Sequence, residues 1–101
     1  MHDLSDERFF QKHADFCAVF SNPNRLKLVD ILAGGDTYTV SELEAEADLS
    51  QSAVSQHLKL MRDQGIVERE KRGVHSYYSL ADERIVEGMK QIQAVLAERL
   101  D

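Results

Sequence analysis

The 101-residue sequence has one cysteine, one proline, no tryptophan and no long apolar run. The single cysteine, Cys17, has no disulfide partner within the chain, and neither a CxxC pair nor a Cys/His cluster indicates a structural zinc. No stretch approaches the about 20 apolar residues that span a bilayer, and the N-terminal MHDLSDERFF lacks the pattern of a signal peptide. These absences predict a cytoplasmic protein in a reducing compartment, with no membrane partner.

Acidic residues outnumber basic ones, and the formal net charge is −6. The charge is uneven, because residues 49–80 hold five Lys and Arg residues against three Asp and Glu, a local +2. This asymmetry is compatible with one nucleic-acid-binding face on a body that otherwise repels a polyanion. The length and the 43% hydrophobic content fit a single modest core, so we expect one domain over residues 1–101.

Two helices are predicted in the first third of the chain. The first covers about residues 5–20, where aromatic residues and one histidine recur at helical spacing. These residues are Phe9, His13, Phe16 and Phe20. Asn22-Pro23 has the form of an N-cap followed by proline at the first helical position, and it predicts a second helix over about 23–33. Gly34-Gly35 ends that helix. Its expected inward-facing residues are Leu26, Leu28, Val29, Ile31 and Leu32.

A helix–turn–helix is predicted over about residues 40–64. Thr39-Val-Ser-Glu42 fits a capping box and opens a short helix over about 40–47. Asp48-Leu-Ser50 supplies the turn, because aspartate tolerates a left-handed backbone and serine caps the next helix. That helix covers about 51–64 and ends at glycine. The residues expected to face inward from the two helices are Val40, Leu43, Ala47, Val54, Leu58 and Met61.

A wing and a final helix follow. Residues 66–70 and 75–80 read as two strands of a wing over about 66–80, joined across Lys71-Arg-Gly-Val74 as a basic tip. Ser79-Leu-Ala-Asp82 is a second candidate capping box, and it opens a helix over about 82–100. One apolar stripe runs along that helix through Ile85, Met89, Ile92, Leu96 and Leu100.

This order of elements predicts a mostly α winged helix–turn–helix fold, with about five helices and a two-stranded hairpin. A helix that enters the major groove needs an apolar face toward the domain and a polar face toward base edges. The residues expected to meet DNA are Gln51, Ser52, Ser55, Gln56, His57, Lys59, Arg62, Lys71 and Arg72. His57 either supports the helix or contacts DNA. A polar helix face alone is also typical of an ordinary solvated surface, so the prediction depends on the ordered combination of elements.

The stretches SNPNRLKLVDIL, LSQSAVSQHLKLMRDQGIV and YYSL resemble the ArsR/SmtB family of bacterial and archaeal transcriptional repressors across roughly residues 14–80. Asp48 departs from the glycine that is usual in the family's turn. The resemblance implies a homodimer that binds operator DNA and releases it on a signal, with the first and last helices as the dimer interface. The residues expected in that interface are Phe9, Phe16, Ile85, Met89, Ile92 and Leu96.

The metal sites known in this family look absent. A cysteine pair would open the third helix, but here the stretch is Thr39-Val-Ser-Glu-Leu43. The site between the last helices keeps two carboxylates, in Asp82 and Glu98, but lacks both imidazoles, because the matching stretch at the start is Asp82-Glu-Arg84 and the later pair falls on Val95 and Glu98. The remaining candidates are His2, His13 and Cys17. We interpret the histidines as surface or interface residues and the cysteine as a small buried apolar residue.

We therefore predict a DNA-binding transcriptional regulator, a dimeric repressor of a palindromic operator with no cofactor and no metal. No nucleophile–base pair or phosphate loop supports an enzyme. From a different class, the alternative is a winged-helix protein-interaction module that has lost DNA binding, which the net charge of −6 favours. The Gln, Ser, Lys and Arg residues on the fourth helix favour DNA.

Overall fold

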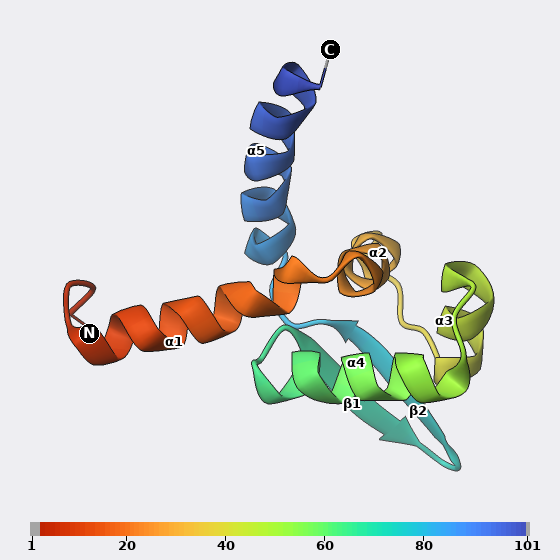
Figure 1. Ribbon diagram of the computed structural model, residues 1–101. Helices are drawn as coiled ribbons and strands as arrows, with labels where there is room; N and C mark the ends of the chain where they lie inside the picture. The colour runs from red at the N-terminus through yellow and green to blue at the C-terminus, as the bar shows by residue number, and fades with distance from the viewer. Residues whose placement is uncertain (1–2, 101) are drawn as a thin grey trace.

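The computed structural model describes residues 3–100. Over that range the chain forms five α-helices, one 3-10 turn and one antiparallel hairpin (Figure 1). The elements in order are α1 (Glu7–Ala18), η1 (Val19–Ser21), α2 (Pro23–Leu32), α3 (Val40–Ala47), α4 (Gln51–Asp63), β1 (Val67–Arg72), β2 (His75–Leu80) and α5 (Arg84–Arg99). The predicted winged helix–turn–helix architecture is confirmed.

Short-range capping contacts define the helix–turn–helix, as predicted. The Thr39 hydroxyl accepts from the Glu42 N–H at 3.2 Å, and the Glu42 carboxylate accepts from the Thr39 N–H at 2.8 Å. Asp48 takes the left-handed conformation at φ 54° and ends α3. The Ser50 hydroxyl accepts from the Ala53 N–H at 3.1 Å and starts α4. The turn between the two helices is therefore set by side chains within it.

The core lies between α2, α3, α4 and the start of the hairpin. Its fully buried apolar side chains are Val19, Leu28, Val29, Leu32, Leu43, Ala47, Val54, Leu58, Met61, Ile66 and Val67. The predicted inward face of α4 is confirmed by its three members in this set. Leu26, Ile31 and Val40 were also expected inside, but they are only half-buried at the edge of the core.

The hairpin differs from the prediction at its tip. The ladder continues through Lys71 opposite Ser76 and Arg72 opposite His75, so only Gly73-Val74 forms the turn. Gly73 has φ +61°, the positive value that two-residue hairpin turns require. Lys71 and Arg72 are therefore strand residues with alternating directions, and they do not form a loose tip. Because the strand begins one residue later than predicted, Ile66 is a core residue that precedes it.

A backbone bridge ties the hairpin to the helix–turn–helix. Tyr38 and Tyr78 exchange two N–H···O bonds, of 2.9 Å from the Tyr38 N–H and 2.7 Å from the Tyr78 N–H. Tyr38 directly precedes the Thr39 cap of α3. The strand β2 is thus anchored to the segment before α3 as well as to β1.

The predicted cap of the last helix is wrong. Ser79 is a strand residue opposite Glu68, so it cannot serve as an N-cap. The Asp82 carboxylate instead accepts from the Arg84 N–H at 2.9 Å, and α5 begins at Arg84. The pairing of β2 holds the backbone extended as far as Leu80, which delays the helix by about two residues.

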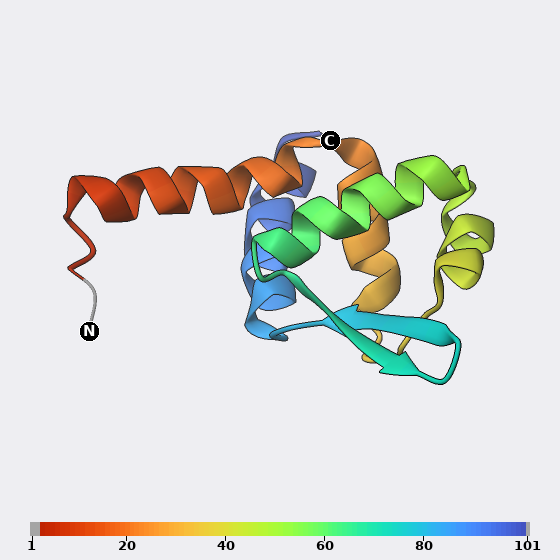
Figure 2. The ribbon, with the colours of Figure 1, turned by 90° about the horizontal axis from the view of Figure 1, so that it is seen from below.

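The helices α1 and α5 leave the body as two separate rods (Figures 1 and 2). No side chain of α1 is buried, and Val86 alone is buried in α5. Cys17 is exposed on α1, which corrects the expectation of a buried residue, because α1 reaches the core only at its C-terminal end. Within residues 3–100 no helix is long and apolar enough to cross a membrane.

Candidate nucleic-acid interface

The side of α4 that faces away from the core carries short polar and basic side chains. The residues exposed there are Gln51, Ser52, Ser55, Gln56 and Lys59. They lie opposite the buried stripe that holds α4 to α2 and α3, so the helix presents a polar face on a rigid support. Arg62, also expected on this face, is half-buried near the end of the helix.

Lys59 pairs with Asp63 one turn further along α4. The ammonium lies 2.9 Å from the carboxylate, and the Lys59 side chain remains 71% exposed. A surface pair of this kind contributes about 0.2–1 kcal/mol. This ion pair is therefore weak enough for Lys59 to exchange Asp63 for a DNA phosphate.

His57 lies at the edge of the polar face and not on it. Its side chain is half-buried, and burial lowers its pKa below the ordinary 6.5, with a further lowering from the positive charge of Arg25. Burial disfavours the charged imidazolium. His57 is thus a neutral side chain near pH 7, positioned between α4 and α2.

Opposite faces of the wing carry its two predicted DNA-contacting residues. The Arg72 guanidinium lies 4.8 Å from the centre of the Tyr77 ring and 3.1 Å from the Glu70 carboxylate, on one face of the hairpin. This carboxylate raises the pKa of Arg72, and the arginine in turn lowers the pKa of Glu70. Lys71 points to the other face, where Arg69 is also exposed. We had not predicted a role for Arg69, but the strand alternation would have placed it beside Lys71.

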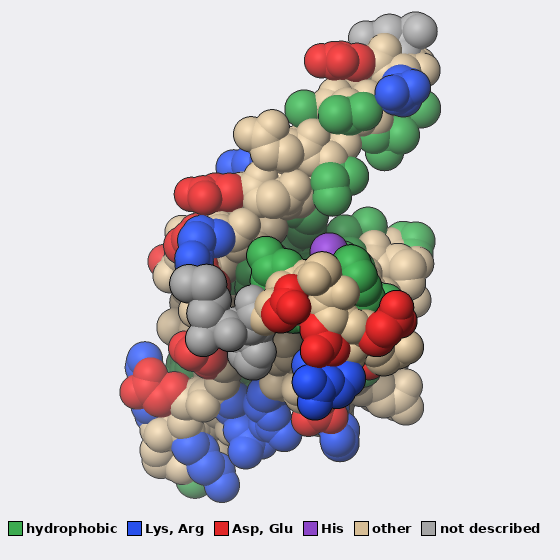
Figure 3. All heavy atoms as spheres, turned by 90° about the vertical axis from the view of Figure 1, so that its left-hand side faces the viewer, with side chains coloured by type: hydrophobic (Ala, Val, Ile, Leu, Met, Phe, Trp, Pro, Cys, Tyr) green, Lys and Arg blue, Asp and Glu red, His purple; other side chains and the backbone are tan. Residues whose placement is uncertain are grey.

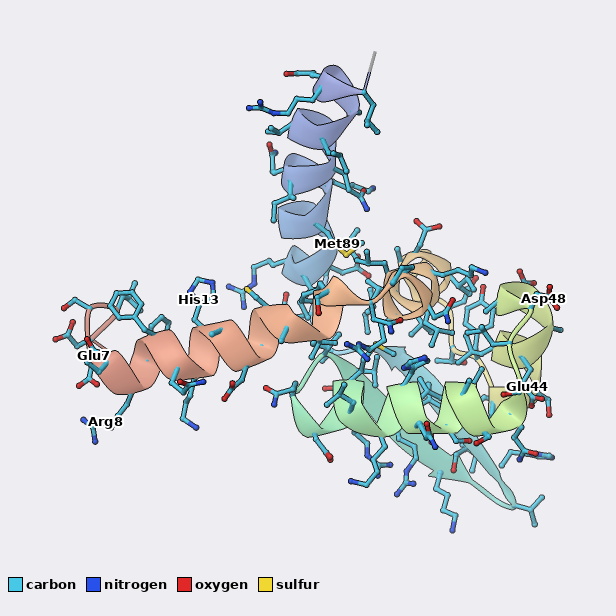
Figure 4. All side chains as sticks on the ribbon, viewed as in Figure 1. Glu7, Arg8, His13, Glu44, Asp48 and Met89 are labelled. Carbon is cyan, nitrogen blue, oxygen red and sulfur yellow. The ribbon has the colours of Figure 1, made fainter. Side chains whose placement is uncertain are left out.

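Charge and apolar surface lie on different sides of the molecule (Figure 3). Lys and Arg side chains gather on the lower side, which carries α4, the hairpin and the underside of α1, whereas hydrophobic side chains follow α5 upward. Arg8 points down from α1, and His13 points up toward the side on which α5 rises (Figure 4). The basic side thus faces away from the apolar rod.

The residues predicted for a dimer interface fall into two groups. Phe16, Ile85 and Met89 pack against the core where α1 and α5 join the body, and Phe9 is half-buried against His13 at 6.3 Å between ring centres. In contrast, Ile92 is 72% exposed and Leu96 is 53% exposed. Other large apolar side chains that are exposed on the two rods or directly beside their ends are Leu4, Phe10, Val95 and Leu100.

Possible metal ligands are not brought together. Within residues 3–100 no three His, Cys, Asp or Glu side chains lie close enough to hold a metal ion. The Arg84 side chain binds Asp82 at 2.7 Å, and hydrogen bonds from Arg84 lower the pKa of that carboxyl to about 2. Glu98 is exposed. His2, a candidate ligand in the sequence, lies outside the described residues.

Comparisons with known proteins agree with this geometry. A family model described as "Bacterial regulatory protein, arsR family" matches residues 22–69. The "Transcriptional repressor SmtB homolog" of Synechocystis sp. is 34% identical over 87% of this chain, and the match spans 66% of that relative, just under two thirds. The "HTH-type transcriptional regulator YgaV" of Escherichia coli is 32% identical over 74% of this chain and 76% of its own length.

The fold also matches a solved structure. The solution structure of the homodimeric winged helix-turn-helix DNA-binding domain Mb0332 from Mycobacterium bovis has a TM-score of 0.82 and 24% identity. The match covers 99% of this chain and 94% of the other. At this identity the likeness concerns the fold alone.

Proposed function

This chain belongs to the arsR family of bacterial regulatory proteins, whose members are DNA-binding transcriptional regulators and not enzymes, and we propose that it acts as a homodimeric repressor that reads a two-fold symmetric operator with α4. One observation carries the proposal. The exposed polar face of α4 lies on the same side of the molecule as the basic wing, and the uncovered apolar stripe of α5 lies on another. One surface thus suits DNA and the other suits a second copy of the chain.

The reading residues are those at the start and middle of α4. In helix–turn–helix proteins the N-terminal residues of the second helix contact base edges. Gln56 is exposed there, and glutamine pairs bidentately with adenine. Ser52 and Ser55 suit base edges or phosphates, and Lys59 suits a phosphate. The buried stripe beneath them holds the helix still, so these side chains would meet the groove in a fixed register.

The wing supplies contacts that hold DNA without reading it. Lys71 and Arg69 lie exposed on one face of the hairpin, and Arg72 lies on the other. Phosphate contacts fix register and orientation but carry no sequence information directly. We assign this holding role to the wing because its charges project from a hairpin that the Tyr38–Tyr78 bridge anchors next to the start of α3.

The dimer follows from the apolar surface of the rods. Ile92, Val95 and Leu96 on α5 and Leu100 at its C-cap are all at least half-exposed. Monomeric proteins rarely leave a long contiguous apolar stripe in water, and a C2 dimer covers the same stripe on both copies. Two α4 helices related by a two-fold axis would read half-sites about one helical turn apart, which predicts a palindromic operator.

We propose further that metal does not release this repressor. Thr39 and Glu42 are engaged in the capping box of α3, and Asp82 is engaged by Arg84. Neither position offers the thiolate or imidazole ligands that zinc and arsenite favour. Adding zinc, cadmium or arsenite should therefore leave the DNA complex intact in a gel shift. Stoichiometric binding with loss of the complex would overturn this and point to His2, His13 or Cys17.

Selection of duplexes from a random pool, followed by footprinting, tests the whole proposal. The wild-type protein should select a palindrome. Gln56→Ala should weaken that duplex by about 1–3 kcal/mol per half-site and random DNA much less. Gln64→Ala is the matched control, because Gln64 is the C-cap of the same helix and lies away from the reading end. Failure to select any duplex would favour the protein-interaction module instead.

A further inference from the structure

A single side chain of α2 binds the end of the α1–η1 segment. The Arg25 guanidinium donates from Nε to the Val19 carbonyl at 2.6 Å and from Nη2 to the Ala18 carbonyl at 3.3 Å. Among residues 3–100, these are the only side-chain hydrogen bonds that join α1 and η1 to the part of the chain that follows them. Ser21 also donates to Ala18, at 2.6 Å, but it belongs to η1 itself.

The two carbonyls are acceptors that α1 leaves at its C-terminal end. The last carbonyls of a helix have no partner within the helix, and this end carries partial negative charge. The last turn of α1 contains no basic residue of its own. Arg25 supplies the missing cation from another helix. Since the guanidinium is planar and its N–H groups have a fixed geometry, its two hydrogen bonds constrain both the distance and the orientation of the end of α1 relative to α2.

The apolar joint beside these bonds is narrow. Val19 is buried, and Phe16 and Phe20 are partly buried with ring centres 5.9 Å apart. The remainder of α1 projects from the body without touching the core (Figures 1 and 2). Because so few apolar side chains hold α1 to the body, the direction of α1 depends on the polar contacts at its C-terminal end.

Arg25 is also close to the reading helix. Its positive charge is the second cause, after burial, of the lowered pKa of His57 on α4. The guanidinium therefore lies where α1 ends and α2 begins, and its charge acts on a side chain of α4.

We propose that Arg25 is a positioning residue that fixes the direction of α1 relative to α4, and so sets which operator spacer the dimer prefers. The inference rests on the proposed function, since it needs α1 in the dimer and α4 on DNA. At a rise of about 1.5 Å per residue, the 12 residues of α1 extend about 18 Å. A tilt of about 10° at the base moves the far end by about 3 Å, close to the about 3.4 Å between base pairs.

The test is a spacer series. The duplex selected by the wild-type protein is remade with its half-sites moved one base pair closer and one or two base pairs apart. The wild-type protein should prefer its own spacer by about tenfold or more, the size of one misplaced base contact. Arg25→Gln should lose most of that preference, to less than about threefold, while random DNA is bound as before. Arg25→Lys keeps the charge but not the fork, and should fall between them.

Lys27→Gln is the matched control. Lys27 also lies on α2 and caps a helix end, donating to the Ala47 carbonyl at 2.9 Å, but its target lies inside the helix–turn–helix. Its loss should weaken binding at every spacer in the same proportion. If Arg25→Gln behaves like Lys27→Gln, Arg25 is merely structural and the inference is overturned. If Arg25→Gln does not fold, the comparison of Arg25→Lys with the wild-type protein decides in the same way.

A second measurement needs no DNA. In a Cys17→Ser background, a spin label at Glu46→Cys on the exposed side of α3 reports the distance between the bodies of the two protomers. Arg25→Gln should shift or broaden this distance by about 3 Å, the lever estimated above, and Lys27→Gln should not. An unchanged distribution would refute the positioning role. If the wild-type protein selected no duplex, the proposed function would fail while this distance still tested how α1 is held.

Discussion

The helices α4 and α5 are both amphipathic and of similar length, yet the apolar stripe of α4 is buried and most of the apolar stripe of α5 is exposed. The stripe of α4 is completely covered, with Val54, Leu58 and Met61 buried against its own chain. The stripe of α5 is covered only at its start, and its continuation through Ile92 and Leu96 is exposed. The outward face of α4 is polar, so the exposed surface of α4 suits DNA and the exposed surface of α5 suits protein.

An apolar stripe in a sequence therefore predicts that the stripe is buried, but it does not tell whether the same chain or a second chain buries it. The cover of α4 comes from elements close in sequence, since α2, α3, α4 and the hairpin each pack on the next. No element within residues 3–100 remains to cover the far half of α5.

The largest effect is expected from a charge on the α5 stripe. Ile92→Glu would place two carboxylates in the proposed dimer interface, and burying an unpaired charge is strongly unfavourable. We expect the dimer to weaken by about 4 kcal/mol or more, which is about a thousandfold. Sedimentation should then give 11.5 kDa in place of about twice that mass.

Ala94→Glu is the control for this change. At 3.6 residues per turn, Ala94 lies on the opposite side of α5 from Ile92 and Leu96. It should leave the mass of the wild-type protein unchanged. A wild-type protein that sediments as a monomer at micromolar concentration would contradict the proposed interface altogether.

Substitution of Leu58 and of Leu96 distinguishes burial within one chain from burial in the dimer. Leu58→Ala in α4 removes a side chain that is 1% exposed, and we expect it to lower the free energy of unfolding by about 2–5 kcal/mol at any protein concentration. Leu96→Ala in α5 should act only through the dimer, so its effect should depend on concentration. Denaturant melts at two protein concentrations check this. Equal, concentration-independent losses would mean that α5 is covered within one chain.

A smaller effect is expected where the basic side of the molecule continues from α4 onto the wing. Arg72→Ala should weaken operator and random DNA alike, and lower the salt dependence by roughly one unit per lost contact, or two per dimer.

Glu70→Gln removes the carboxylate that lies 3.1 Å from Arg72 and competes with phosphate. We expect it to strengthen random binding about two- to fivefold, the size of a surface ion pair. Titrations at several salt concentrations measure both; weaker binding by Glu70→Gln would contradict this account.

The smallest effect concerns pH and His57. Its pKa in the folded chain lies below the ordinary 6.5, so the unfolded chain takes up the proton first as the pH falls. Stability should therefore decline from about pH 6.5 down to the folded pKa and then level off. Melting curves should show a smaller decline over this window for His57→Gln. In Arg25→Gln the pKa of His57, followed by NMR, should rise because a nearby positive charge is gone.

What could be predicted from the sequence was determined by short-range chemistry. The Thr39 capping box, the Asn22 and Ser50 caps and the left-handed Asp48 all depend on residues within three or four positions, so each was predicted correctly. The family pattern also rests on this part of the chain, which explains why the fold and the position of α4 were both predicted.

The errors arose where strand pairing and tertiary packing decide. The strand ladder extended through Arg72 because Gly73 allowed a two-residue turn, and the same ladder removed Ser79 from its predicted cap. Cys17 was expected to be buried, but its exposure depends on how far α1 projects from the body. The contacts of Arg25 were not foreseen, since its acceptors lie on a separate helix whose exit direction local patterns do not encode.

The Tyr38–Tyr78 bridge has a consequence for how the chain folds. Most elements of the body pack on their neighbours in sequence, whereas this bridge closes a loop of about 40 residues, with an entropy cost of about 3 kcal/mol. Contacts of such long range are favourable only once the intervening segment is ordered. We therefore expect the bridge to form late, after the helices and the hairpin. In a nascent chain the basic strands would then stay unanchored until the bridge closed, and only the complete domain could bind a duplex.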